Sequence, residues 1–87
     1  MTFNLSFSRR AANYLRRMDR ESQERMAVAF RILCEDPLVR RSKPLRDPAG
    51  RRAFRVGGWR IIYFIDDQNY NVHVDMIGPR GEVYREL

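Results

Sequence analysis

The chain has 87 residues, a mass of 10.4 kDa and a formal net charge of +6, with 44% hydrophobic and 32% charged residues. A chain of this size buries about two thirds of its surface in one core, so we expect one domain spanning residues 1–87. Its longest apolar stretch, residues 61–65, is too short for a membrane span, and no signal-peptide pattern is present. We therefore expect a cytoplasmic protein without membrane contact, in which the lone Cys34 excludes an intrachain disulfide and a multi-cysteine zinc site.

The chain begins with the pattern of a strand followed by a helix. Phe3, Leu5 and Phe7 alternate with polar residues, which predicts a half-buried strand. Ser8 is the expected N-cap of a first helix. The apolar residues of this helix share one face: Ala11, Leu15 and Met18.

A second helix and a basic loop are expected next. Asp19 is the predicted cap of the helix, which ends before Pro37. Its apolar residues recur with helical spacing: Met26, Ala29, Phe30 and Leu33. Residues 38–50 contain two prolines, much charge and little periodicity, so we expect a connecting loop there.

The second half of the chain has the two-residue period of strands. Phe54 and Val56 share one face of a strand, and Ala53 and Arg55 share the other. The dipeptide Gly57-Gly58 predicts a two-residue hairpin turn with positive φ at both positions.

Residues 59–65 are nearly all apolar, as expected of a central strand with both faces covered. Arg60 is the exception, and it shares a face with Ile62 and Phe64. Phe30 and Trp59 are expected in the core.

Two more strands are predicted, at residues 70–77 and 82–85. In the first of them, Val72, Val74 and Met76 alternate with polar residues and are expected on one face. The order β-α-α-β-β-β-β predicts an α+β domain with a mainly antiparallel sheet and the helical hairpin on one face.

The excess of positive charge lies in one segment. Residues 40–60 contain eight basic residues and one acidic residue, whereas the rest of the chain contains nine basic and ten acidic residues. Sixteen of the 17 basic residues are arginine, which favours bidentate contacts with phosphate. Such a segment indicates a polyanion partner, with an ordinary solvated surface as the alternative. The candidate binding residues are Arg40, Arg41, Lys43, Arg46, Arg51 and Arg52.

Few residues can carry out catalysis. A two-histidine acid–base pair is excluded because His73 is the only histidine, and it is expected to be a hydrogen-bonded sheet residue. Cys34 is expected to pack in the core. The sequence has no Gly-rich phosphate loop and no metal-binding motif, so no cofactor or metal is expected.

Four residues at predicted strand and turn positions remain as catalytic candidates: Arg55, Arg60, Arg80 and Tyr84. Arginine binds phosphate and stabilises negative charge that develops on it. A tyrosine beside several guanidinium groups has a lowered pKa and can accept a proton. Together they indicate a metal-free nuclease, with ordinary structural roles for all four as the alternative.

The most specific motif is the hairpin RVGGWRIIY, followed by the ending IGPRGEVY. With these motifs the sequence from Phe7 to Arg85 resembles the RelE/ParE superfamily, the toxins of bacterial and archaeal type II toxin–antitoxin systems. The resemblance implies a RelE-like fold with the same β-α-α-β-β-β order. It also implies an acidic, RelB-like antitoxin as partner and binding of promoter DNA through the toxin–antitoxin complex.

The two branches of this superfamily have different targets. RelE-type toxins cleave messenger RNA in the ribosomal A site by attack of a ribose 2′-hydroxyl on the adjacent phosphate, without a metal. ParE-type toxins inhibit DNA gyrase and lack the nuclease residues.

The resemblance gives each candidate residue a role. Arg55, Arg60 and Arg80 would hold the scissile phosphate, and Tyr84 would act on the 2′-hydroxyl or stack on a base. The six candidate binding residues between Arg40 and Arg52 would contact RNA or the ribosome. Together these residues favour a ribosome-dependent endoribonuclease that inhibits translation.

Two alternatives stay open, because the first basic position of the RelE pattern is occupied here by Ala53. One is a ParE-like gyrase inhibitor without nuclease activity. The other is a degenerate toxin that serves only as a binding module or corepressor.

Overall fold

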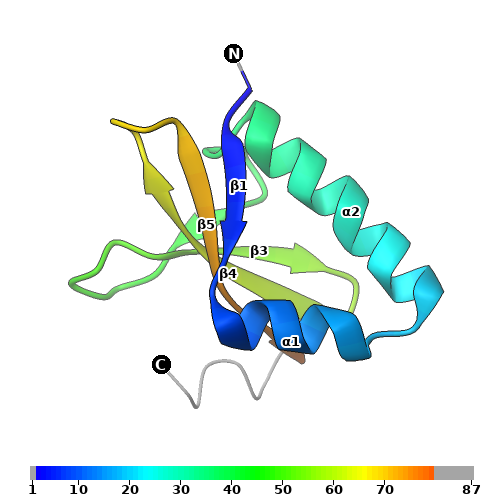
Figure 1. Ribbon diagram of the computed structural model, residues 1–87. Helices are drawn as coiled ribbons and strands as arrows, with labels where there is room; N and C mark the ends of the chain where they lie inside the picture. Colours follow the sequence, from blue (N-terminus) through cyan, green and yellow to red (C-terminus); the bar gives the residue numbers. More distant parts are fainter. Residues whose placement is uncertain (1, 80–87) are drawn as a thin grey trace.

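The computed structural model describes residues 2–79, which form two helices and a five-stranded sheet (Figure 1). In chain order the elements are β1 (Asn4–Phe7), α1 (Arg9–Arg17), α2 (Arg20–Glu35), β2 (Lys43–Pro44), β3 (Arg52–Val56), β4 (Trp59–Asp66) and β5 (Asn71–Pro79). The α+β class predicted from the sequence is confirmed.

The strands are arranged in the order β1-β5-β4-β3-β2. The pairs β5–β4, β4–β3 and β3–β2 are antiparallel, and β1 pairs parallel with β5, so the sheet is mainly antiparallel as predicted. β4 is the central strand, which explains its nearly continuous apolar sequence. Ile61 and Ile62 point to opposite faces, and both are completely buried.

Both helices begin where the sequence predicted. The N-cap of α1 is Ser8, whose Oγ accepts a hydrogen bond from the backbone N–H of Ala11 at 3.1 Å. The N-cap of α2 is Asp19, and the helix ends two residues before Pro37. Neither described helix is long and apolar enough to cross a membrane.

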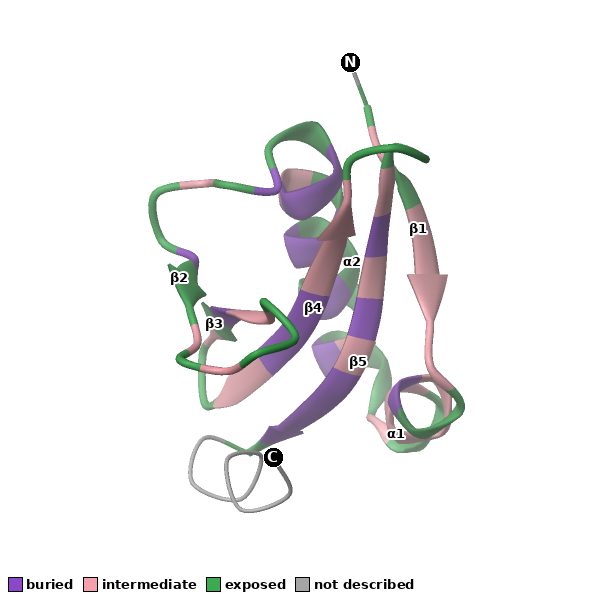
Figure 2. Ribbon diagram, turned by 90° about the vertical axis from the view of Figure 1, so that its left-hand side faces the viewer, coloured by how far each residue is buried: buried purple, intermediate pink, exposed green. Residues whose placement is uncertain are grey.

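Both helices pack on one face of the sheet and enclose the main core with it (Figure 2). The buried residues of this core are Ala11, Met26, Ala29, Phe30, Leu33, Phe54, Ile61, Tyr63, Val72, Val74 and Ile77. Phe30 is therefore a core residue as predicted. Its ring packs edge to face against the ring of Phe7, with the two ring centres 5.2 Å apart. Trp59 packs against the core but is only half-buried, because it follows the exposed β3–β4 turn.

Strand β5 contains a bulge that the sequence did not predict. The pairing register between β4 and β5 shifts after Ile62, which leaves Asp75 as an extra residue in β5. Met76 was predicted on the same face as Val72 and Val74, and this is wrong. The extra residue reverses the alternation, so Met76 belongs to a second, smaller cluster on the opposite face.

The predicted loop at residues 38–50 contains the short strand β2. Lys43 pairs with Ala53, and Pro44 pairs with Arg52. Two residues are too few to show a strand period in the sequence, and proline is compatible with this edge position. The predicted strand at 82–85 lies outside the described residues.

The β3–β4 turn differs from its prediction in one dihedral angle. Gly57 has a positive φ of 56°, whereas Gly58 is not among the residues with positive φ. Positive φ at the first central position alone is typical of a type II′ turn, which also suits the twist of a hairpin.

Candidate functional site

The face of the sheet that points away from the helices carries the candidate site. Ala53 and Arg55 of β3 share this face with Arg60 and Ile62 of β4. Each within-strand pair was predicted, and the register between β3 and β4 brings the two pairs together. Phe54 points the other way, into the main core. The strand period therefore separates the cationic side chains from the residues that hold the fold together.

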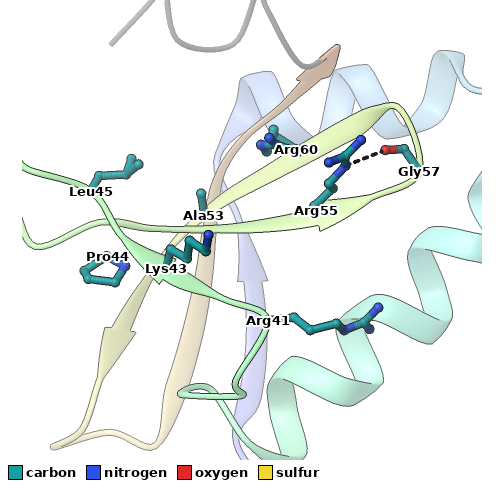
Figure 3. A pocket seen from close by; sticks show the side chains of 8 residues that line it. All are labelled: Arg41, Lys43, Pro44, Leu45, Ala53, Arg55, Gly57 and Arg60. Atoms are coloured by element: carbon teal, nitrogen blue, oxygen red, sulfur yellow. Dashed lines mark hydrogen bonds between the residues drawn. The ribbon is translucent and has the colours of Figure 1, made fainter.

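An open cavity of about 900 Å³ lies on this face beside β2, β3 and β4 (Figure 3). The described lining residues include several cations and no carboxylate: Arg41, Lys43, Pro44, Leu45, Ala53, Arg55, Gly57 and Arg60. In Figure 3, Ala53 lies in the middle of this set, between Leu45 on one side and Arg55 on the other. The cavity thus combines a small apolar surface with a cationic border.

Arg55 and Arg60 are direct cross-strand partners. Like charges in this position destabilise a sheet, so the pair is not explained by the stability of the hairpin. The Nε of Arg55 donates a hydrogen bond to the Gly57 carbonyl at 3.3 Å, which orients its guanidinium group. Two neighbouring arginines at a cavity whose described lining has no carboxylate attract an anion such as phosphate.

The other predicted cations around the cavity differ in how they are held. Lys43 is exposed at the cavity border. The guanidinium carbon of Arg41 lies 4.9 Å from the centre of the Phe54 ring, a cation–π contact that places Arg41 at the end of the cavity near α2 (Figure 3). Arg40 and Arg46 are exposed and do not line the cavity.

Arg51 and Arg52 are occupied by contacts within the protein. Arg51 donates to Asp47 at 3.1 Å and to Asp75 at 3.2 Å. Partial desolvation opposes the charge on Arg51, but hydrogen bonds to both carboxylates outweigh it and raise the pKa of the guanidinium group. Arg52 donates to the Oγ of Ser42 at 2.9 Å. Both side chains therefore fix the segment that precedes β3.

Two further groups were predicted to be structural, and this is confirmed. The Nδ1 of His73 lies 2.7 Å from the Oγ of Ser6 in the neighbouring strand, so His73 is a hydrogen-bonded sheet residue. Cys34 is buried, and burial raises the pKa of its thiol. The other two catalytic candidates, Arg80 and Tyr84, lie outside the described residues.

Asp75 is a residue of this region that the sequence analysis did not identify. Its carboxylate accepts hydrogen bonds from Arg10 of α1 at 3.0 Å and from Arg51. Its carbonyl accepts a hydrogen bond from the Oγ of Ser8 at 2.5 Å. The only signal in the sequence was an acidic residue within a strand, which did not indicate a bulge or its partners.

The arrangement around the cavity suits the binding of a phosphate group. Arginine stays protonated under all physiological conditions, so Arg55 and Arg60 can neutralise a phosphate and stabilise charge that builds up on it. The apolar surface formed by Leu45 and Ala53 provides a place for a group without charge beside that phosphate.

Comparison with solved structures shows close similarity in fold. A chain of the archaeal RelE–RelB complex from Pyrococcus horikoshii OT3 has a TM-score of 0.81 at 20% identity, over 94% of this chain and 99% of that chain. A chain of the toxin–antitoxin complex RelBE2 from Mycobacterium tuberculosis has a TM-score of 0.80 at 26% identity, over 94% of this chain and 95% of that chain. A mutant of the Escherichia coli toxin RelE in the free state has a TM-score of 0.78 at 26% identity, over 99% of this chain and 94% of that chain.

Sequence comparison gives the family. No curated protein matches the chain. Residues 5–84, nearly the whole chain, match the family model described as the ParE toxin of the type II toxin–antitoxin system, parDE. The chain therefore belongs to the ParE toxin family of type II toxin–antitoxin systems, within the RelE/ParE superfamily.

Proposed function

We propose that this toxin cleaves messenger RNA on the ribosome and thereby inhibits translation. The observation that carries the proposal is the cross-strand pair of Arg55 and Arg60 at a cavity whose lining residues between 2 and 79 include no carboxylate. Gyrase inhibition by surface contact does not require two arginines at directly opposed strand positions, whereas phosphoryl transfer benefits from arginines that hold the phosphate. Similarity to RelE toxins supports the same function.

The proposed reaction is an internal transfer of the phosphate. The ribose 2′-oxygen forms a bond to the adjacent phosphorus and loses its proton, while the bond from phosphorus to the 5′-oxygen breaks and that oxygen takes up a proton. The products are a cyclic phosphate and a 5′-hydroxyl. No metal or cofactor takes part in this scheme.

Each candidate residue has a role in this scheme. Arg55 and Arg60 hold the phosphate and stabilise the extra negative charge of the transition state. Arg80 assists them, and Tyr84 accepts the 2′-proton or stacks on a base. Lys43 and Arg41 contact the neighbouring backbone of the message, together with the exposed Arg40 and Arg46.

An acidic, RelB-like antitoxin is the proposed partner that keeps the toxin inactive. Two of the similar structures are toxin–antitoxin complexes, RelE–RelB and RelBE2. The cationic cavity suits a partner rich in carboxylates. We expect the complex to act in the cytoplasm and to bind promoter DNA through the antitoxin.

The test is primer extension on messenger RNA in a purified translation system. The protein should produce new 5′ ends that require the ribosome. Arg55→Gln and Arg60→Gln should each lower the cleavage rate by roughly 100-fold or more, because each removes a donor from the transition state. Arg80→Ala and Tyr84→Phe should abolish cleavage. Arg31→Gln, an exposed site on α2, is the matched control and should cleave normally.

A second candidate function is inhibition of DNA gyrase, which the match to the ParE family model favours. Its test is a supercoiling assay with purified gyrase. Inhibition of supercoiling without any ribosome-dependent cleavage would replace the nuclease proposal. Absence of both effects, with normal antitoxin binding, would indicate a degenerate toxin that acts as a corepressor.

A further inference from the structure

Helix α1 carries a second cationic surface. Four of its nine residues are arginine and none is acidic, and all four arginines are exposed: Arg9, Arg10, Arg16 and Arg17. The charge count along the sequence did not reveal this surface, because acidic residues elsewhere in the chain balance it.

Helical geometry gathers these charges on one side. At 100° per residue, Arg9, Arg16 and Arg17 fall within an arc of about 100°, on the side away from the buried Ala11 and the half-buried Leu15. Arg9 and Arg17 are about 12 Å apart along the helix axis, so the arginines form a stripe of that length along the outside of the molecule.

The stability of the protein does not explain the whole stripe. Arg10 is paired with Asp75 at 3.0 Å, and Arg16 donates to the side chain of Asn13. Arg9 and Arg17 form no ion pair with any residue between 2 and 79. Arg9 also lies in the first turn, where the helix dipole disfavours a positive charge.

Helix α1 and the cavity lie on opposite faces of the sheet. α1 packs against β5 and β1, whereas the cavity lies beside β2, β3 and β4 (Figure 2). The stripe is therefore a surface separate from the cavity.

We propose that α1 binds the phosphate backbone of folded, double-stranded RNA through Arg9, Arg16 and Arg17. This inference rests on the proposed function, in which the cavity holds the single strand that is cut. Double-stranded RNA is recognised mainly through its backbone, which suits a stripe of arginines without base-reading contacts. A lipid surface fits less well, because the exposed large hydrophobic residues of the described chain, Val28, Leu38 and Tyr70, lie outside α1.

The experiment measures binding of the full chain to an RNA duplex of about 16 base pairs at several salt concentrations. The test variant is Arg9→Gln/Arg17→Gln. The control is Arg20→Gln/Arg31→Gln, which changes the net charge equally at two exposed positions of α2. The test variant should bind about tenfold more weakly near 0.1 M salt, and the slope of log K against log salt should fall by about 1 to 2. The control should bind like the unmodified protein.

Equal losses in the two variants would overturn the inference, because they would show attraction by net charge alone. Normal duplex binding by Arg9→Gln/Arg17→Gln would overturn it as well. The inference would also be overturned if Arg9→Gln/Arg17→Gln lost binding to vesicles of anionic lipid but kept binding to the duplex.

Failure of the proposed function gives a different result. Loss of duplex binding in the α1 variant, together with no cleavage by the unmodified protein, would refute the nuclease proposal and leave the RNA-binding surface established. Cleavage that persists while both double variants bind the duplex equally would refute this inference alone.

Discussion

At the scale of single residues, a buried tyrosine hydroxyl is paired with a buried carbonyl. Tyr63 is completely buried in the central strand, and its hydroxyl donates a hydrogen bond of 2.6 Å to the carbonyl of Pro37. A buried carbonyl needs such a partner, because it has lost its contact with water. This bond attaches the segment that leads from α2 to β2, and hence one border of the cavity, to the middle of the sheet.

Tyr63→Phe should therefore lower the free energy of unfolding by about 1–3 kcal/mol, because it leaves the Pro37 carbonyl buried without a donor. Urea denaturation gives this value. Tyr70→Phe, at a side chain with 49% exposure, is the control and should be nearly neutral. Equal stability of the two variants would show that water replaces the hydroxyl.

The two glycines of the β3–β4 turn provide a second comparison between single residues. Gly57→Ala should cost roughly 1–2 kcal/mol, because an L-residue at a φ of 56° is strained. An added Cβ would meet Arg25 only at 3.6 Å, so the cost comes from the backbone. Gly58→Ala meets no atom within 4 Å and should be tolerated. Thermal unfolding of the two variants measures both effects. A greater loss of stability for Gly58→Ala than for Gly57→Ala would contradict the turn geometry.

At the scale of elements, α2 supplies much of the core. Its buried residues recur every three or four positions: Ser22, Met26, Ala29, Phe30, Leu33 and Cys34. Between them, exposed residues such as Val28 point away from the sheet. The sequence period predicted this face correctly, because it depends only on the geometry of one helix.

Phe30→Ala should lower the free energy of unfolding by about 3–5 kcal/mol, because it removes a buried ring and leaves a cavity beside Phe7. Val28→Ala on the same helix should change it little, since that side chain is 51% exposed. Chemical denaturation of both variants tests the assignment of the helix faces. A small effect at Phe30 would show that the core relaxes into the space.

At the scale of the whole molecule, one network of charges joins three distant segments. Arg51 binds Asp47 of its own loop and Asp75 of the β5 bulge, and Asp75 also binds Arg10 of α1. Desolvation opposes the charge on Asp47, but hydrogen bonds from the Ala49 backbone and from Arg51 outweigh it and lower the pKa of this carboxyl group. The network holds the basic loop against the sheet.

The pH dependence of stability follows from this shift. A carboxyl group whose pKa is lower in the folded than in the unfolded state stabilises the fold above its unfolded pKa of about 3.9. That contribution is lost as the pH falls through the folded pKa. We expect the melting temperature to fall below about pH 4, and to fall less steeply for Asp47→Asn than for the unmodified protein. Asp67→Asn, at an exposed position, should keep the original profile.

The overall distribution of charge predicts a strong effect of salt on ribosome binding. With a net charge of +6 and two cationic surfaces, affinity should fall steeply and linearly in a plot of log K against log salt. Sedimentation with ribosomes at several salt concentrations measures this slope. A flat response would contradict an electrostatic contact with ribosomal RNA.

The sequence by itself determined the features that depend on neighbouring residues. The caps Ser8 and Asp19, the buried face of α2 and the shared face of Ala53 and Arg55 all follow from local spacing, and the structure agrees with each. The motifs RVGGWRIIY and IGPRGEVY indicated the superfamily, and the family match agrees.

Only the tertiary structure decided the features that join distant segments. Asp75 becomes a bulge because it meets Ser8, Arg10 and Arg51, and the bulge moves Met76 to the other face. The two-residue strand β2 exists through its pairing with β3. Contacts of this kind join residues far apart in the chain, so no local period predicts them, and they set which arginines are held by hydrogen bonds within the fold and which are exposed.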